Sequence, residues 1–294
     1  MSARPNLGAG RAVLITGASS GLGEACALFL ARAGFQVFAG VRKQADGERL
    51  RRTATGVLIP VTIDVTDEDC VADAARTVTG RLTGSGLWGL VNNAGICVPS
   101  PLAWLEPGQL RRQLDTNVVG TLTVTRAFLP SLRNGGGRIV NVTSGLGRVA
   151  VPFLGAYVAS QFAKEGFSDV LRRELAPLGI AVCVVRPGAI VTPIWDKVTA
   201  DGHRAVSAGD PYHREPFLRF LDSNAETARA SKTTSLDFTR AVLRALTSRR
   251  PRRHYPVGRD ATAAGLVSRF LPTALLDRQF AAVVTPPGSA DGAT

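Results

Sequence analysis

The chain has 294 residues, of which 45% are hydrophobic and 20% are charged, and its mean hydropathy is +0.10. This length and composition suit one large globular domain and exclude a disordered or collagen-like chain. Lys and Arg outnumber Asp and Glu by 35 to 23, and arginines concentrate in residues 240–259, where no acid occurs. We interpret this excess as a solvated arginine-rich face and expect no nucleic-acid partner.

The cysteines lie far apart, with no CxxC pair and no neighbouring histidine cluster. They therefore predict neither a disulfide framework nor a metal site, and they favour a reducing, cytoplasmic compartment. Near the N-terminus the apolar run covers Val13 to Thr16 at most before glycines intervene. Such a run is too short for a signal peptide or a membrane span, so we expect no integral membrane segment.

Short β-branched runs alternate with helical stretches along the chain, which predicts a parallel sheet joined by crossover helices. The predicted strands are residues 12–16, 36–41, 57–63, 87–91, 138–142, 180–186 and 254–257. The predicted helices are residues 24–33, a segment after strand three capped by Thr66 or Asp67, and residues 106–132, 153–176, 236–246 and 260–284, the last interrupted by Pro272. The pattern predicts an α/β fold, with one doubly wound parallel sheet in a single domain over residues 1–294.

The segment after strand six is irregular and polar, from Pro187 to about Ser231, because prolines and glycines interrupt it. A loop this long inside a compact domain is usually functional, so we predict a substrate lid over residues 188–231. The last residues, 287–294, are small and polar, and we expect them to be frayed.

A glycine-rich run, TGASSGLG at residues 16–23, lies between a predicted strand and a predicted helix. This is the context of a dinucleotide-binding loop in a Rossmann fold. Gly17 permits the tight turn, Gly21 lets the backbone approach the pyrophosphate, and Gly23 lets helix and strand pack closely. The helix N-terminus adds unpaired N–H groups and a positive dipole end. The predicted phosphate site consists of Gly17, Ser19, Ser20, Gly21, Leu22 and Gly23.

The end of strand two indicates which nicotinamide cofactor is bound. An acid there would hold the ribose 2′-hydroxyl of NAD, whereas a cation would accept the 2′-phosphate of NADP. The strand ends in Arg42 and Lys43, with no acid before Asp46. Arg42 can grip a phosphate through two parallel hydrogen bonds, Lys43 adds charge, and Ser19 offers a hydroxyl. We therefore predict NADP(H) as the cofactor.

Together with these features, further motifs make the chain resemble the short-chain dehydrogenase/reductase superfamily over roughly residues 11–260. The matching pieces are TGASSGLG at 16–23, DV at 64–65, NNAG at 92–95, Asn117 in DTNVVG, Ser144 in NVTSG, Tyr157 in YVASQ and PGAIVT at 187–192. The flanking runs GRIVNVTS and EGFSDVLRRELAPLGI are similar to the branch that includes retinol and hydroxysteroid dehydrogenases.

The resemblance implies a role for each matching residue. For the cofactor, the resemblance implies that Asp64 and Val65 contact the adenine and that Asn93, Ala94 and Gly95 lie behind the adenine ribose. It also implies that Ile190 and Thr192 hold the nicotinamide carboxamide, in the segment that begins with Pro187 and Gly188. For catalysis, it implies that Tyr157 is the acid/base, that Ser144 holds the substrate oxygen, and that Asn117 positions a water in the proton relay.

The sequence departs from the family motif at one catalytic position, because Tyr-x-x-x-Lys should place lysine where this chain has Gln161. In an α-helix, Gln161 lies about 40° round and about 6 Å along from Tyr157, so the two share a face. Its amide can bond the nicotinamide ribose hydroxyls, but it supplies no positive charge. Lys164 returns to nearly the same face about 10.5 Å along the axis. Lys164 is therefore a candidate for a displaced cation, because a lysine stem could cover part of that distance, but we favour the interpretation that it is a surface cation beside Glu165.

The loss of that charge favours one reaction direction. A cation beside the phenol favours tyrosinate, which alcohol oxidation needs as its base. Ketone reduction needs the neutral phenol as proton donor, and an unassisted tyrosine is already neutral at neutral pH. We therefore predict an NADPH-dependent ketoreductase.

The substrate is expected to be bulky and apolar, from the branch resemblance and from the apolar residues near the expected cleft, which are Ile96, Val98, Val149, Val151, Phe153, Leu154, Ile194 and Trp195. An alternative is a repurposed fold that keeps the nucleotide for non-redox chemistry or regulation. Another is that Gln161 is an engineered replacement. The outer faces of the helices at 106–132 and 153–176, which this family pairs across a symmetry axis, predict a homodimer or homotetramer.

Overall fold

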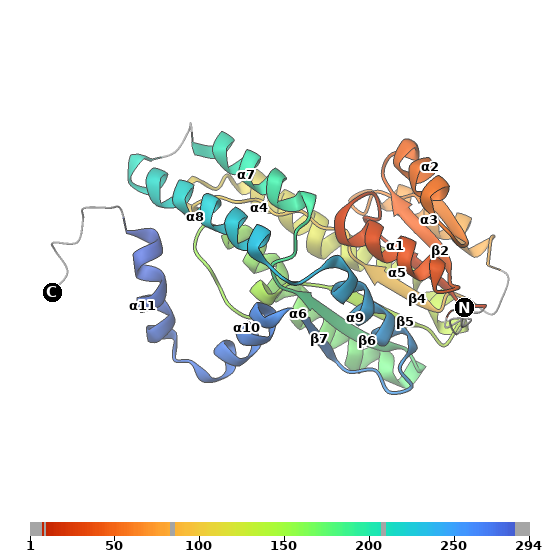
Figure 1. The fold of residues 1–294 in the computed structure, drawn as a ribbon. Helices are drawn as coiled ribbons and strands as arrows, with labels where there is room; N and C mark the ends of the chain where they lie inside the picture. The colour runs from red at the N-terminus through yellow and green to blue at the C-terminus, as the bar shows by residue number, and fades with distance from the viewer. Residues whose placement is uncertain (1–7, 9, 83–85, 207–209, 286–294) are drawn as a thin grey trace.

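The computed structural model describes residue 8 and residues 10–82, 86–206 and 210–285 (Figure 1). Within these residues, seven parallel strands form one sheet in the order β3-β2-β1-β4-β5-β6-β7. The strands are β1 (Ala12–Ile15), β2 (Gln36–Val41), β3 (Leu58–Thr62), β4 (Gly89–Asn92), β5 (Arg138–Val142), β6 (Ala181–Pro187) and β7 (His254–Val257). The order reverses between β1 and β4, which confirms the predicted doubly wound Rossmann fold.

Helices cover both faces of the sheet, because successive strand residues point to opposite sides. On β1, Val13 and Ile15 join the core under α1 (Gly21–Arg32), α2 (Gln44–Thr53) and α9 (Ser235–Thr247). Ala12 and Leu14 of the same strand join the core under α3 (Glu68–Thr79), α5 (Gly120–Asn134) and α6 (Gly155–Leu175). Both cores are apolar and buried, so the carboxyl ends of the strands are held rigidly.

The segment predicted as an irregular lid is mostly helical. It forms α7 (Pro193–Val206) and α8 (Pro211–Ala230), and Pro193 and Pro211 are the first residues of these helices. Proline is favoured at a first helical position, where its missing N–H has no intrahelical partner to lose, so these prolines start helices. The two helices pack closely at Gly202, where a Cβ would lie 2.5 Å from the side chain of Leu221. The predicted frayed tail, 287–294, lies outside the described residues.

The predicted helix at 106–132 is interrupted. It consists of α4 (Pro107–Leu114), a wide π-helical turn η2 (Asp115–Val119) and α5. Asn117 lies in that turn, with its Oδ1 accepting from the backbone N–H of Ile96 at 2.9 Å and its Nδ2 donating to the Ile96 carbonyl at 3.0 Å. Single wide turns of this kind occur frequently at functional sites.

The C-terminal helices extend away from the sheet. The predicted break at Pro272 is confirmed, since it separates α10 (Arg259–Phe270) from α11 (Thr273–Val284). Figure 1 shows α11 standing apart from the sheet, on the side of α8. It is tied there by Arg219 of α8, whose Nη2 donates to the Thr285 carbonyl at 2.7 Å. Among the helices of the described residues, none combines the length and apolarity needed to cross a membrane.

Candidate functional site

A cavity of about 840 Å³ opens at the carboxyl ends of the central strands, next to the reversal between β1 and β4. Ligands of doubly wound sheets bind at this kind of position. The structure brings the predicted residues into this one wall, with the exception of Lys43, which is exposed and precedes α2. The predicted site residues that line it are Gly17, Ser19, Ser20, Gly21, Leu22, Gly23, Arg42, Asp64, Val65, Asn93, Ala94, Gly95, Asn117, Ser144, Tyr157, Gln161, Pro187, Gly188, Ile190 and Thr192.

The glycine loop has the backbone geometry of a phosphate cradle. Gly17 and Gly21 adopt left-handed conformations, with φ of 65° and 59°. A Cβ on Gly23 would lie 2.2 Å from the carbonyl oxygen of Gly17, so a larger residue there would push the loop off the helix. No side chain of the described residues caps the first turn of α1, so its N–H groups remain available for an anion.

Sequence reasoning missed an arginine that holds this loop. Arg49 of α2 donates through Nη2 to the Ser19 carbonyl at 2.8 Å and through Nη1 to Glu24 at 2.6 Å. It therefore ties α2 to the loop and to the first turn of α1. Nothing in the local sequence pattern signals this contact, because it joins two helices across the end of β2.

At the end of β2, Arg42 lies near Asp64, the first residue of the predicted adenine site. Asp64 Oδ1 accepts hydrogen bonds from the backbone N–H of Thr66 at 3.0 Å and from its hydroxyl at 2.7 Å. The backbone bond is the main reason that the pKa of Asp64 is lowered, and the positive charge of Arg42 contributes. The lowered pKa favours the ionised form of Asp64. Arg42 supplies a positive charge to the cavity wall at the carboxyl end of β2.

Ser144 and Tyr157 come from different elements and meet at the same wall. Ser144 follows β5 and begins a short 3₁₀ turn, η3 (Gly145–Gly147), with its Oγ accepting from the Leu146 N–H at 3.1 Å. Tyr157 lies in the first turn of α6. Burial raises the pKa of the Tyr157 phenol, the nearby Cys97 thiol adds to this, and a hydrogen bond with Ser144 opposes it. The net effect raises the pKa and so favours the protonated form of the phenol.

Asn117 is connected to the turn of α6 that carries Tyr157. Its Nδ2 donates to the Ser160 hydroxyl at 3.1 Å, and that hydroxyl donates to the Tyr157 carbonyl at 2.7 Å. Gln161 is buried beside them, with Nε2 donating to Ser160 at 3.4 Å. Gln161 Oε1 has no hydrogen-bond partner among the described residues. A buried unpaired acceptor in the cavity wall fits a ligand that carries hydroxyl donors, such as the ribose of a dinucleotide.

The interpretation of Lys164 as a surface cation is wrong. Only 2% of the residue is exposed, and its Nζ donates to the Val142 carbonyl at 2.7 Å. The face of α6 that packs on β5 is polar, so Lys164 finds a backbone acceptor inside the protein. Burial lowers the pKa of Lys164 to about 8, against the opposing charge of Glu165. Lys164 also lines the cavity.

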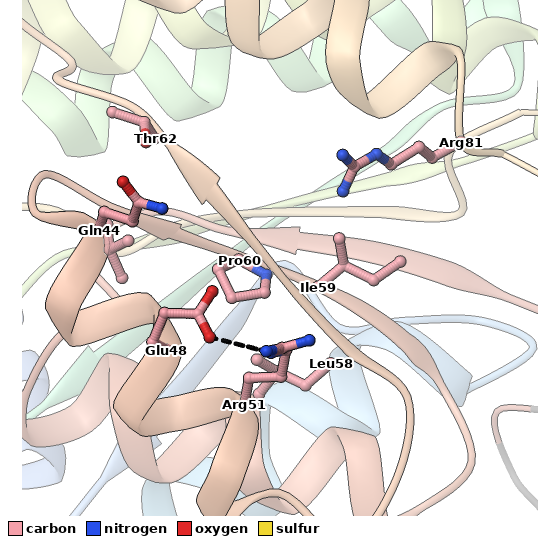
Figure 2. A pocket seen from close by; sticks show the side chains of 9 residues that line it. Gln44, Glu48, Arg51, Leu58, Ile59, Pro60, Thr62 and Arg81 are labelled. Atoms are coloured by element: carbon pink, nitrogen blue, oxygen red, sulfur yellow. Dashed lines mark hydrogen bonds and ion pairs between the residues drawn. The ribbon is translucent and has the colours of Figure 1, made fainter.

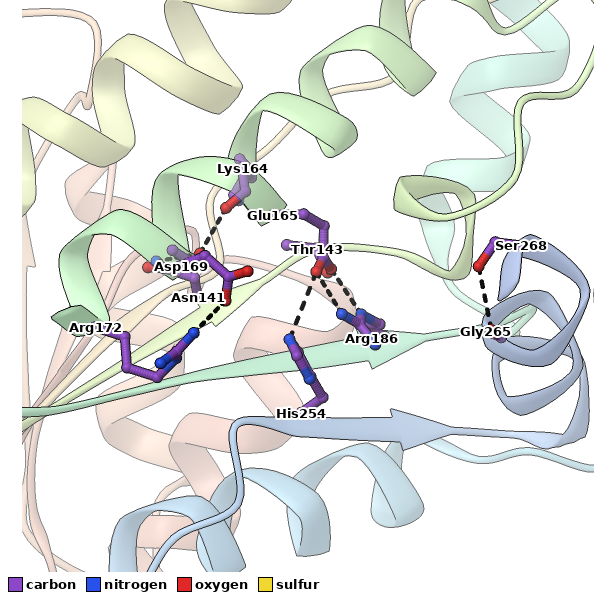
Figure 3. A network of polar contacts seen from close by, with 11 residues as sticks. Asn141, Thr143, Lys164, Glu165, Asp169, Arg172, Arg186, His254, Gly265 and Ser268 are labelled. Carbon is purple, nitrogen blue, oxygen red and sulfur yellow. Dashed lines mark hydrogen bonds and ion pairs between the residues drawn. The ribbon is translucent and has the colours of Figure 1, made fainter. Parts of the chain in front are cut away.

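A buried ion pair lies beneath the Ser144 turn. Glu165 accepts from Arg186 Nε at 2.8 Å, from Arg186 Nη2 at 2.5 Å and from the Thr143 hydroxyl at 2.8 Å. Figure 3 shows Arg186 and His254 reaching this carboxylate from β6 and β7, with His254 Nε2 at 4.0 Å. Burial, followed by the charge of Arg186, lowers the pKa of His254. The cluster joins α6 to three strands directly behind Ser144.

The substrate side of the cavity is partly as predicted. Its lining includes four of the apolar residues singled out in the sequence, Ile96, Leu154, Ile194 and Trp195. The others, Val98, Val149, Val151 and Phe153, are not in this wall. Phe153 packs against Phe217 and Phe220 of α8, with ring centroids 5.5 Å apart in each pair.

A second cavity, of about 420 Å³, lies between α2 and the edge strand β3 (Figure 2). It contains an ion pair in which Arg51 Nη2 lies 2.8 Å from Glu48 Oε2, with both side chains largely in solvent. None of the predicted catalytic residues lines it. The large cavity is therefore the candidate site.

Comparison with known proteins identifies the family. The family model described as short chain dehydrogenase matches residues 11–202. The chain belongs to the short-chain dehydrogenase family. This short-chain dehydrogenase is 42% identical to a 3-amino-tetrahydro-pyrrolizinone reductase of Xenorhabdus hominickii over 276 residues, which cover 92% of this chain and 94% of the relative. It is 36% identical to human retinol dehydrogenase 5, over 95% of this chain and 90% of the relative.

Among solved structures, this short-chain dehydrogenase is similar to one from Burkholderia cenocepacia that was crystallised in complex with NADP. The two share 28% identity at a TM-score of 0.71, over 95% of this chain and 99% of that chain. The predicted family, its retinol and hydroxysteroid dehydrogenase relatives and the fold are thus confirmed.

Proposed function

We propose that this short-chain dehydrogenase is an NADPH-dependent ketoreductase, in which Tyr157 donates a proton to a substrate carbonyl held by Ser144. The observation that carries this proposal is the placement of Tyr157 and Ser144, which come from different elements, share a hydrogen bond and line the same cavity. Burial raises the pKa of the Tyr157 phenol and so favours its protonated form. A proton donor must carry its proton before the reaction, whereas alcohol oxidation would require the phenolate. When bound, the nicotinamide supplies the hydride.

NADP(H) is the proposed cofactor because of the charge at the end of β2. Arg42 lines the cavity there, beside the predicted adenine residues Asp64 and Val65. A guanidinium matches the 2′-phosphate that distinguishes NADP from NAD. The NADP complex of the Burkholderia cenocepacia relative supports the same assignment.

The proposed substrate is a bulky apolar ketone. Ile96, Leu154, Ile194 and Trp195 provide apolar surface in the same wall as Tyr157. The α7–α8 pair lies over this wall, and we assign it the role of substrate lid, since it contributes Ile194 and Trp195 from α7. Relatives named as retinol and hydroxysteroid dehydrogenases support a lipid-like substrate class.

The free cysteines support the expected cytoplasmic location.

The proposal is tested by following NADPH absorbance in the presence of steroid, retinoid and polycyclic ketones. We expect at least one ketone to be reduced, and Tyr157→Phe to lower that rate by about 10²- to 10⁴-fold, the usual contribution of general acid catalysis. Tyr212→Phe is the matched control, because Tyr212 is 59% exposed and does not line the cavity. If Tyr157→Phe reduced the ketone as fast as the unmodified protein, the Ser144 and Tyr157 pair would not be the catalytic centre, and the repurposed fold would be favoured.

A further inference from the structure

Helices α7 and α8 bring polar side chains to the large cavity as well as apolar ones. Ile194 and Trp195 of α7 line its apolar part. Asp201 of the same helix lines the cavity too, together with Asn224 and Thr227 of α8. Because Ile194 and Asp201 are seven residues apart, they lie on one face of α7, about 10.5 Å apart along its axis. The wall therefore has a polar section about two turns beyond its apolar section.

The amide of Asn224 has a hydrogen-bond donor that the protein leaves unused. Its Nδ2 is buried and has no partner among the described residues. Gln161 Oε1, which fits a cofactor ribose, is in the same condition in this wall. Buried polar groups are nearly always hydrogen-bonded, so an unpaired donor in a cavity wall indicates an acceptor on a ligand. The adenine, ribose and phosphate residues predicted for the cofactor do not include Asn224.

The carboxylate of Asp201 offers the complementary acceptor. Its Oδ1 pairs with Arg204, three residues further along α7, and the Arg204 side chain is 73% exposed. An exposed pair of this kind contributes little free energy, so a ligand can share the carboxylate. Burial raises the pKa of the Cys97 thiol, and the charge of Asp201 adds to this. Asp201 thus acts on the same cavity region as Cys97, which in turn contributes to the raised pKa of Tyr157.

The packing of α7 on α8 brings Asp201 and Asn224 to neighbouring turns. The two helices meet at Gly202, where a Cβ would lie 2.5 Å from the Leu221 side chain. Asp201 directly precedes Gly202, and Asn224 follows Leu221 by less than one helical turn. The donor and the acceptor therefore come from the same contact between two helices, and both residues line the cavity.

The charges around Asp201 favour a neutral ligand group over a cation. Lys197 and Arg204 lie four residues before it and three residues after it, so all three side chains are neighbours on the surface of α7. The helix itself thus supplies the positive charge that this carboxylate attracts. A hydroxyl or an amide suits the pair without adding charge, since each has a donor for Asp201 and an acceptor for Asn224.

We propose that Asp201 and Asn224 form a recognition site for a second, neutral polar group of the substrate, a hydroxyl or an amide, remote from the carbonyl that Tyr157 protonates. This inference rests on the proposed function and narrows its substrate class. The apolar body of the ketone lies against Ile194 and Trp195, and its far end carries the polar group. A site of this kind is selective, because an analogue without the group leaves buried polar atoms unpaired.

The kinetic test compares a steroid ketone that has a hydroxyl on the ring farthest from the carbonyl with the same ketone lacking that hydroxyl. The unmodified protein should reduce the hydroxylated ketone with a kcat/KM about tenfold or more above that of the plain ketone. Asn224→Leu should diminish this preference by about threefold to tenfold, and Asp201→Asn by about tenfold, since hydrogen bonds to charged groups are stronger.

The kinetic constants should show where the loss arises. It should appear in the KM for the hydroxylated ketone, with kcat changed by less than about twofold, because the bond to the remote group is the same before and during the reaction. The plain ketone should respond by less than about twofold to either variant. Asn134→Leu is the matched control, because Asn134 is an exposed asparagine outside the cavity.

A binding measurement separates this inference from the proposed function. Trp195 lies in the cavity wall, so tryptophan fluorescence can follow each ketone as it binds to the complex with NADP, which cannot reduce it. The losses in Asn224→Leu and Asp201→Asn should recur in Kd. If no ketone were reduced but the preference in Kd depended on Asn224, the recognition site would stand and ketone reduction would be refuted.

The stability of Asn224→Leu gives an independent check. Because Nδ2 has no partner among the described residues, the replacement removes no hydrogen bond of that atom, and the midpoint of urea unfolding should not fall. A marked fall would instead assign the amide a structural role and overturn its part in recognition. Asp201→Asn tests the ligand preference without changing α8.

Three further results would overturn the inference. One is equal Kd values for the two ketones in the unmodified protein. Another is a loss in Asn224→Leu that is the same for both ketones. The third is tighter binding of the corresponding amino ketone, protonated at neutral pH, which would make Asp201 a cation site. In each case a large loss of activity in Tyr157→Phe would leave the proposed function standing.

Discussion

The buried ion pair behind Ser144 makes a quantitative prediction about stability. The side chains of Arg186 and Glu165 are 10% and 9% exposed, and two hydrogen bonds join them. Arg186→Met leaves the Glu165 carboxylate buried with the Thr143 hydroxyl as its close donor and His254 at 4.0 Å. Removing one partner of a buried pair costs about 3–5 kcal/mol, since the other charge remains without its counterion.

The matched control is the exposed pair of Figure 2. Arg51 and Glu48 also lie 2.8 Å apart, but their side chains are 62% and 40% exposed. Arg51→Met should therefore lower the free energy of unfolding by less than about 1 kcal/mol. Both variants can be compared with the unmodified protein by urea unfolding at neutral pH, followed by circular dichroism.

The double variant Glu165→Gln/Arg186→Met separates the pair from the packing around it. With both charges removed, the loss should be smaller than the sum of the single losses by about 2 kcal/mol, the coupling expected of groups in direct contact. The reasoning would be refuted if Arg186→Met cost no more than Arg51→Met, or if the two single losses at Arg186 and Glu165 simply added. Figure 3 shows why the coupling should be large, because both side chains meet in one cluster between α6 and the strands.

The remaining predictions concern the cofactor, the pH dependence of folding and the assembly. Arg42→Ala should narrow the difference between the binding free energies of NADPH and NADH by about 1–3 kcal/mol, as calculated from dissociation constants measured by fluorescence titration. Lys43→Ala, outside the cavity wall, should change this difference less. Burial lowers the pKa of Lys164 from 10.5 to about 8, so between these values the unfolded chain binds more protons at this residue than the folded protein does. The contribution of Lys164 to the free energy of unfolding should therefore increase with pH, by about 3 kcal/mol in full. The buried cysteine thiols, whose pKa values are raised by burial, act in the opposite direction, so the Lys164 contribution is measured as the difference between the unmodified protein and Lys164→Met in urea unfolding. Light scattering should show a homodimer or homotetramer, and a species of 30.9 kDa alone would contradict the predicted assembly.

Most of the sheet was predictable because its strands are short apolar runs with clear ends. The predicted ranges of β5 and β7 agree with the structure to the residue. Helix α2 was not predicted, because its sequence is strongly polar and it buries only Gly47 and Leu50. Helices α7 and α8 were predicted as irregular chain, because proline occurs both where a helix starts and where a helix breaks, and only the packing partner distinguishes the two cases.

The candidate site was predicted well where a motif carried it and poorly where a tertiary contact did. Motif residues from distant parts of the chain line one cavity, from Gly17 to Thr192. Arg49 was missed, since its contact with the Ser19 carbonyl joins separate elements. Lys164 was misplaced for a different reason: its burial depends on the Val142 carbonyl, a backbone group that no side-chain pattern displays. The one available signal was its seven-residue spacing from Tyr157.

The wide turn at η2 divides one continuous helix into two parts with independent orientation. Each residue of an α-helix advances the side-chain direction by about 100°, so an extra residue in one turn rotates everything after it relative to everything before it. As a result, α4 turns Gln113 toward the backbone of Ile96 and Val98, while α5 buries Phe128 in the sheet core. Substitutions in α4 can therefore reshape the chain around Ile96 without rotating α5 on the sheet, and deletion of one residue in η2 should couple the two parts and withdraw Asn117 from the backbone of Ile96.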